Sequence, residues 1–233
     1  MLTKKHRQKR LRWAKASKEC EVEDWSHVIW SDESKFNVFG SDGRQWCWKN
    51  PTEPLHDCHV QPTVKHGGGS IMVWGCMSWA GVGNLYRIDG IMNSQVYLDI
   101  LDSQLLDTIG RQDLDEAQVI FQHDNDPKHT SGLVQRWLGR QDFSVLEWPP
   151  QSLDLNPIEH LWNEADRRLR LSGTSPTCKD DLWEKIQVVW QNIEVEYIKK
   201  LIRTMPRRRL IFLQLRVDTH VGRLVDDVPS ATY

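Results

Sequence analysis

Three acidic residues, Asp32, Asp124 and Glu159, occupy positions where a purely structural role explains a carboxylate poorly. Thirty-four residues lie between Asp124 and Glu159. Mg²⁺ and similar hard cations take oxygen ligands, usually a few carboxylates together with substrate phosphates. A pair of such ions can activate the attacking oxygen and stabilise the leaving oxygen of a phosphodiester. The three acids therefore predict a centre that holds two Mg²⁺ or Mn²⁺ ions and transfers polynucleotide strands.

The first acid, Asp32, lies within a strand predicted over residues 28–39. The two-residue period of a strand places Asp32 on the face that carries Trp30 and Phe36. Aspartate is depleted in strands, and a buried, unpaired carboxylate is costly. Glu33 alternates to the opposite face, where we expect it to be solvated. The alternative for Asp32 is a place on an edge strand that faces water.

The second acid, Asp124, follows a short apolar strand predicted at residues 118–122. It lies at the carboxyl end of that strand, which is where ligands bind in α/β sheets. A helix cap is the alternative role. Asp126 already suits that role, because Pro127 fits the first position of a helix predicted over residues 127–138. Asp124 is therefore not needed as a cap and is a candidate catalytic residue.

The third acid, Glu159, falls in the first turn of a helix predicted over residues 157–169. Asn156 suits the N-cap of this helix and Pro157 its first position. Glu159 borders the apolar stripe, which comprises Ile158, Leu161, Trp162, Ala165 and Leu169. The alternative is a capping box in which Glu159 reaches back to Asn156.

The elements that must position these acids form an α/β pattern, a mixed sheet flanked by helices. Further helices are expected at residues 3–18, 95–106 and 181–205, the last with a break near Ile193 and a capping box of Thr177 and Asp180. Further strands are expected at residues 70–79, 83–88 and 143–148. A hairpin turn at 41–43 leads to residues 45–48, and residues 49–69 are loop-like, ending in a flexible glycine hinge at 67–69.

Length and composition allow one large domain or two small ones in a soluble globular protein, with 233 residues, 39% hydrophobic and 27% charged. Most of the twelve tryptophans are expected in the core. Five cysteines without a CxxC pair favour a reducing compartment. His56, Cys58 and His59 form a loose cluster that lacks a second ligand pair at zinc-like spacing. No apolar run reaches the length of a membrane span.

Basic residues cluster at two places although the net charge is −2. Eight Lys and Arg residues lie between Lys4 and Lys18, and three more at residues 207–209. Such clusters indicate nucleic-acid contacts or a nuclear-import signal. A solvated basic helix is the equally simple alternative.

Three segments carry longer motifs: WSDESKF at residues 30–36, DNDPKHTS at 124–131 and WPPQSLDLNPIEHLW at 148–162. These closely resemble the catalytic domain of mariner-superfamily transposases of the Tc type, and the 34-residue gap matches that branch. The resemblance runs from about residue 3 to residues 205–208. It implies an RNase H-like fold and an Asp-Asp-Glu triad that cuts transposon ends and joins the 3′-hydroxyl to target DNA. By motif match, Asp32, Asp124 and Glu159 are its catalytic, metal-binding residues.

The resemblance also implies how the chain is divided and what it binds. We expect a basic linker helix at residues 1–22, the RNase H-like catalytic domain at 23–209, and a divergent, disordered tail at 210–233. Relatives carry a bipartite helix-turn-helix region before the catalytic domain, so the sequence is expected to begin at or just after the linker. The expected partners are double-stranded DNA, as transposon ends and target, and a second copy in a homodimer. A nuclear location and no membrane partner are expected.

Two alternatives remain at this point. One is a truncated or decayed transposon remnant that binds DNA weakly and does not transpose. The other is a glycoside hydrolase that uses paired carboxylates, which explains neither the third acid nor the basic clusters.

Overall fold

A five-stranded mixed sheet forms the centre of the structure, a computed structural model that describes residues 2–39 and 69–214, with side chains up to Leu210. Its strands are β1 (Val28–Asn37), β2 (Ser70–Ser78), β3 (Gly81–Ile88), β4 (Ile120–Gln122) and β5 (Ser144–Val145), in the order β3-β2-β1-β4-β5. β1 pairs antiparallel with β2, and β2 antiparallel with β3. β4 joins β1 in parallel, and β5 joins β4 in parallel. The predicted mixed sheet is confirmed.

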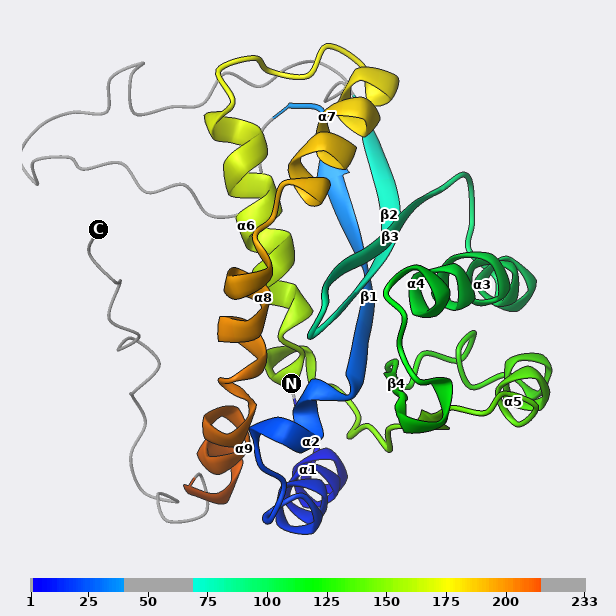
Figure 1. Cartoon of the computed structure of the whole chain (residues 1–233), viewed down its shortest axis with the longest axis vertical. Helices are drawn as coiled ribbons and strands as arrows, with labels where there is room; N and C mark the ends of the chain where they lie inside the picture. Colours follow the sequence, from blue (N-terminus) through cyan, green and yellow to red (C-terminus); the bar gives the residue numbers. More distant parts are fainter. Residues whose placement is uncertain (1, 40–68, 215–233) are drawn as a thin grey trace, which may run out of the picture.

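Helices cover both faces of this sheet (Figure 1). The helices that follow β5 in the chain lie on one side of the sheet; they are α6 (Ile158–Leu171), α7 (Lys179–Gln191), α8 (Val195–Ile202) and α9 (Met205–Gln214). The opposite face carries α3 (Ser94–Ile100), which runs through a π-helical turn (Leu101–Leu105) into α4 (Leu106–Arg111), and α5 (Gly132–Leu138). α1 (Lys4–Ala16) and α2 (Val22–Ser26) lie at the end of the molecule near α9. None of the described helices is long and apolar enough to cross a membrane.

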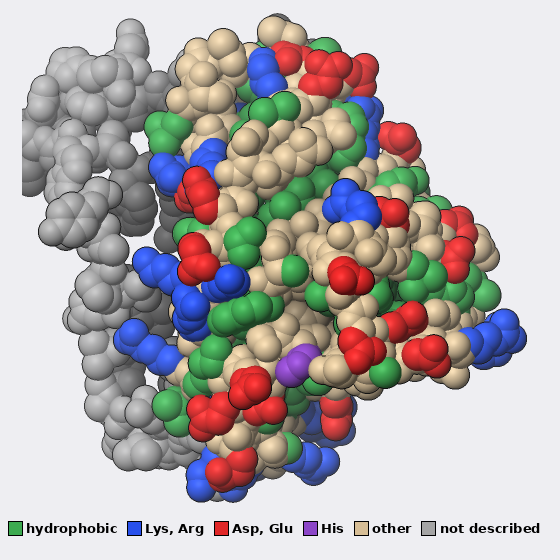
Figure 2. Space-filling model, viewed as in Figure 1, with side chains coloured by type: hydrophobic (Ala, Val, Ile, Leu, Met, Phe, Trp, Pro, Cys, Tyr) green, Lys and Arg blue, Asp and Glu red, His purple; other side chains and the backbone are tan. Residues whose placement is uncertain are grey.

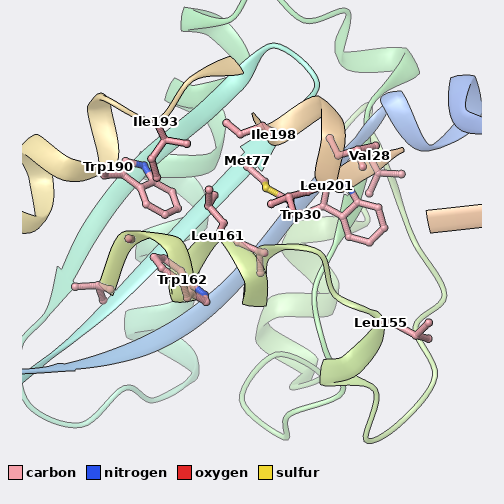
Figure 3. Close-up of a cluster of buried hydrophobic side chains, with 14 of the residues drawn as sticks. Val28, Trp30, Met77, Leu155, Leu161, Trp162, Trp190, Ile193, Ile198 and Leu201 are labelled. Atoms are coloured by element: carbon pink, nitrogen blue, oxygen red, sulfur yellow. The ribbon is translucent and has the colours of Figure 1, made fainter. Parts of the chain in front are cut away.

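Two hydrophobic cores follow from this layering, one on each face of the sheet. The core under α6 to α8 holds six of the seven tryptophans that are buried among the described residues. Within it, Trp162 stacks on Trp190 with ring centroids 4.8 Å apart (Figure 3). The core under α3 to α5 includes Ile29, Trp74, Tyr97 and Phe121. Neighbouring residues of β1 therefore enter different cores, as the strand period requires.

Gly75 of β2 sets how closely α6 approaches the sheet. It is the cross-strand partner of Asp32. A Cβ atom at Gly75 would lie 2.6 Å from Cη2 of Trp162 and 3.2 Å from Cζ2 of Trp190. The missing side chain thus admits the Trp162 ring, one helical turn after Glu159, against the sheet.

α1 packs onto the rest of the fold. Trp13 is buried against Trp25 and Trp148, with ring centroids 5.9 and 5.4 Å away. Arg10 is 6% exposed, and it donates hydrogen bonds to the Gln151 carbonyl and the Asp154 carboxylate. The division of the chain at residue 22 stays a prediction.

Several local predictions need correction. The helix predicted over 127–138 is a turn followed by α5, because the Asp126 carboxylate accepts the Lys128 N–H and Ser131 caps α5 instead. Cys178, and not Thr177, is the N-cap residue of α7, while Thr177 donates to Asp181 rather than forming a box with Asp180.

At the C-terminal end, α9 continues past Arg209 to Gln214, beyond the helical stripe predicted to end near Met205. The hairpin turn at 41–43, the zinc candidates His56, Cys58 and His59, the first two hinge glycines and the tail after residue 214 lie outside the described residues.

Candidate active site

Asp32 and Glu159 meet between β1 and the first turn of α6. The two carboxyl groups influence one another's pKa directly. Pro157, the N-cap residue of α6, forms no side-chain capping hydrogen bond, and Glu159 does not form the alternative capping box with Asn156. Burial, and then the charges of Glu159 and Glu33, raise the pKa of Asp32 well above its ordinary value. Burial also raises the pKa of Glu159, which the interaction with Asp32 only partly opposes. Two carboxylates this close repel one another when both are ionised, and a proton or a cation between them relieves that repulsion.

Asn156 fixes the start of α6 relative to the sheet. Its buried Nδ2 donates to the Ser31 carbonyl at 3.1 Å and to Oε1 of Gln122 at 3.3 Å. Its Oδ1 accepts the Ile158 N–H at 3.3 Å, so the predicted capping side chain is present although α6 begins one residue later than expected. Asn156 thus ties β1, β4 and α6 together directly beside Asp32 and Glu159, a role that the sequence pattern did not reveal.

Asp124 lies just after β4, at the predicted carboxyl end. Its Oδ1 accepts the Asp126 N–H at 2.9 Å and faces Nδ1 of His129 at 2.6 Å. Burial acts to raise the pKa of Asp124, but the hydrogen bonds from His129 and the Asp126 backbone outweigh it and lower the pKa. Asp124 is therefore ionised at neutral pH, whereas the pKa values of Asp32 and Glu159 are raised.

His129 connects Asp124 to Glu33. Nε2 of His129 lies 3.3 Å from Oε1 of Glu33, and the Glu33 side chain is only 14% exposed. The prediction that Glu33 is solvated is therefore wrong, because its face of the sheet is also covered. Burial opposes protonation of His129, but the hydrogen bond to Asp124 and the nearby carboxylate of Glu33 raise its pKa to about 9. Tyr97 stacks on the ring at a centroid distance of 3.9 Å.

Two adjoining clefts open onto these residues. Asp32 and Asp124 line the smaller one, of about 270 Å³, together with the loop that leads to α6. The larger, of about 650 Å³, also reaches Asp124 and is bordered by Lys9 and Arg12 of α1. Glu159 reaches this region through its contact with Asp32.

The structure thus joins Asp32 to Glu159 and brings Asp124 to the same cleft as Asp32. Within the described ranges, no three His, Cys, Asp or Glu side chains are gathered closely enough to hold a metal ion. The joint role of the three acids as metal ligands stays a prediction.

Comparison with known proteins decides the family. Residues 27–183 match the family described as DDE superfamily endonuclease. The Tcb1 transposase of Caenorhabditis briggsae is 44% identical over 211 residues, which cover 89% of this chain and 75% of that protein. The chain belongs to the Tc1/mariner family of DDE transposases. The Tc1 transposase of Caenorhabditis elegans is also 44% identical, over 215 residues, which cover 89% of this chain and 74% of the relative.

Solved structures of the family establish the RNase H-like fold. A Mos1 transposase paired-end complex with the left transposon end matches with a TM-score of 0.78 at 18% identity. That match covers 92% of this chain and 63% of the Mos1 chain, so the chain spans less than two thirds of that protein. The Mos1 catalytic domain with Raltegravir and Mn matches with a TM-score of 0.70 at 17% identity, covering 92% and 96%. The comparisons do not favour the alternatives of a transposon remnant or a glycoside hydrolase.

Proposed function

We propose that this chain is the catalytic part of a DNA transposase that cuts transposon ends and joins the 3′-hydroxyl to target DNA. The observation that carries the proposal is that Asp32 and Asp124 line one cleft, with the Glu159 carboxylate near enough to Asp32 to raise its pKa. Among the described residues neither carboxylate has a salt bridge to Lys or Arg, and such a carboxyl pair is costly for folding alone. It is suited to holding cations at the point where a phosphodiester would enter.

The donor set fits divalent metal ions. All three candidate ligands are carboxylates, which are the hard oxygen ligands that Mg²⁺ and Mn²⁺ take. Structures of the Mos1 catalytic domain are described with Mn and with Mg. Asp32, Asp124 and Glu159 would hold two such ions, which when bound activate the attacking oxygen and stabilise the leaving oxygen. A proton held by Asp32 or Glu159 would be displaced as the ligands become ionised.

DNA would reach the acids through the larger cleft. Lys9 and Arg12 border it, are exposed, and have no side-chain partner among the residues described. Such free cations can neutralise phosphates and fix the register of the strand without reading its sequence. Other Lys and Arg side chains lie along the side of the molecule formed by α6 and α8 (Figure 2).

Three further parts of the proposal extend from the family. The acids are expected to act at two transposon ends within a homodimer, since a Mos1 complex is described as paired-end. The protein is expected to work in the nucleus, where its DNA substrate lies. The catalytic domain is expected to span residues 23–209.

A plasmid-nicking assay tests the proposal without knowledge of the transposon ends. The full chain should convert supercoiled plasmid to the nicked form in Mn²⁺ but not in EDTA. Asp32→Asn should abolish nicking while leaving the chain folded, as judged by circular dichroism. Equal nicking by the wild type and the Asn variant would assign the activity to a contaminant and reject the proposal.

A further inference from the structure

The two carboxylate oxygens of Asp124 are in different environments. Oδ1 accepts from the Asp126 N–H at 2.9 Å and from His129 Nδ1 at 2.6 Å. No residue in the described part of the chain bonds Oδ2. The Asp124 side chain is 41% exposed and lines the cleft, so Oδ2 is the oxygen left for a ligand.

His129 is held from three directions. Its side chain is only 4% exposed, and Tyr97 stacks on the ring. Nε2 faces Glu33, whose carboxylate also lies 4.0 Å from Nζ of Lys128. Both ring nitrogens face carboxylate oxygens, and an ionised carboxylate can accept hydrogen bonds but cannot donate them. Neither nitrogen therefore offers a lone pair to a metal, and the ring is suited to orienting Asp124 rather than to joining it as a ligand.

Glu33 links His129 and Asp124 to the other two acids, Asp32 and Glu159. Asp32 and Glu33 are neighbours in β1 and point to opposite faces of the sheet. Asp32 contacts Glu159 directly, whereas Glu33 reaches Asp124 through His129. One strand therefore sets the positions of both remaining acids, each from a different face.

We propose that His129 is a positioning residue that holds Asp124 by Oδ1, with Glu33 fixing the ring, so that Oδ2 is presented to a divalent ion. This rests on the proposed function, in which Asp124 is a metal ligand. Loss of an outer partner of a metal ligand weakens metal binding by roughly 10–100-fold.

Electron paramagnetic resonance titration of Mn²⁺ on the full chain tests the role without an activity assay. His129→Gln can reach Glu33 but loses the donor at the Nδ1 position, and we expect Mn²⁺ binding to weaken by roughly 10–100-fold. His129→Asn keeps an amide donor near the Nδ1 position and should retain most of the affinity. Imidazole added to His129→Ala should restore part of the loss. Tyr97→Phe keeps the stacked ring, removes only the hydroxyl that faces His123 at 3.2 Å, and should bind Mn²⁺ as the wild type does.

The outcomes separate this inference from the function on which it rests. If Asp124→Asn loses Mn²⁺ affinity but His129→Gln and His129→Ala retain it, the positioning role is rejected and the ligand assignment stands. If His129→Asn and His129→Gln lose Mn²⁺ affinity equally, and imidazole does not restore binding to His129→Ala, then His129 is only a packing residue and the inference is overturned. If Asp124→Asn itself binds Mn²⁺ like the wild type, the proposed ligand set fails instead.

Discussion

Arg209 of α9 donates a hydrogen bond from Nη1 to the backbone carbonyl of Ser17, which caps the end of α1. The same nitrogen lies 3.3 Å from the Cys20 carbonyl, and the Arg209 residue is only 6% exposed. The contact joins residues 192 positions apart. Because of it, the basic N-terminal helix and the C-terminal helix stabilise one another.

Replacing Arg209 with Met should destabilise the fold by about 2–3 kcal/mol. Methionine keeps the apolar stem but leaves the buried Ser17 carbonyl and the partly buried Cys20 carbonyl without their charged donor, and hydrogen bonds to charged groups contribute about that much. Urea unfolding followed by tryptophan fluorescence measures the change. Arg207→Met is the matched control, since Arg207 is exposed on the same helix and should change stability by under about 0.5 kcal/mol. Equal effects of the two substitutions would show that the Ser17 contact contributes nothing.

The double variant Lys9→Ala with Arg12→Ala should weaken DNA binding more than Lys15→Ala with Lys18→Ala. Both pairs remove two positive charges from one end of the molecule, but only the first pair borders the larger cleft. Binding of a scrambled duplex at several salt concentrations should show a log–log slope reduced by nearly two for the first pair. Indistinguishable slopes would mean that DNA responds to overall charge and not to this cleft.

Glu164→Gln should flatten the acid limb of the stability curve. Hydrogen bonds from Arg167, against a smaller opposing effect of burial, and then from Arg168, lower the pKa of Glu164 to about 2. A lowered folded pKa stabilises the protein above the ordinary value of 4.5, and this contribution disappears as pH falls from 4.5 towards 2. Because Arg167 is 58% exposed, screening limits the effect to about 1 kcal/mol.

Chemical unfolding of Glu164→Gln at pH 7, 4 and 2.5 checks this prediction. The wild type should be more stable at pH 7, and the difference should nearly vanish at pH 2.5. Glu184→Gln, at an exposed position on α7, should leave stability nearly unchanged at every pH. A difference that grows on acidification would have the wrong sign.

Glu159→Gln should stabilise the metal-free protein near neutral pH by about 1 kcal/mol, or roughly 2–4 °C in melting temperature for a chain of this size. Raised folded pKa values at Asp32 and Glu159 mean that the fold binds protons more tightly than the unfolded chain. The stability that these bound protons contribute is therefore lost as pH rises through the folded pKa values. The neutral amide of Glu159→Gln relieves the repulsion between the two carboxylates.

Melting in EDTA and in Mn²⁺ separates the two roles of this carboxyl. The wild type should gain stability with Mn²⁺, because the ion binds the native state preferentially. Glu159→Gln should start higher and gain much less. A full Mn²⁺ gain in the variant would remove Glu159 from the ligand set.

The sequence predicted the sheet, the order of elements and the positions of the three acids, because each rests on local periodicity and capping. It misjudged Glu33 for a physical reason. Alternation correctly assigned Glu33 to the face opposite Asp32, but it could not show that α3 to α5 bury that face as well. The same limit hid the roles of Asn156 and Arg209, since their partners lie 125 and 192 positions away.

The short turn after Asp126 illustrates a different limit. Proline and an acidic cap were consistent with a continuous helix, yet His129 is used in that turn to reach Asp124 and Glu33. A helix running on through residues 127–138 would carry the ring elsewhere. Local helix signals were overridden by a tertiary contact at the site.

The absent side chain at Gly75 makes the geometry of the acids depend on a residue that carries no functional group. A single added methyl group would act as a wedge between β2 and α6, since its carbon would lie 2.6 Å from the Trp162 ring. The wedge would act one strand away from Asp32 and one helical turn away from Glu159. The distance between the two carboxyl groups thus depends on steric clearance in the core. A substitution at a position that contacts neither DNA nor metal can therefore abolish catalysis.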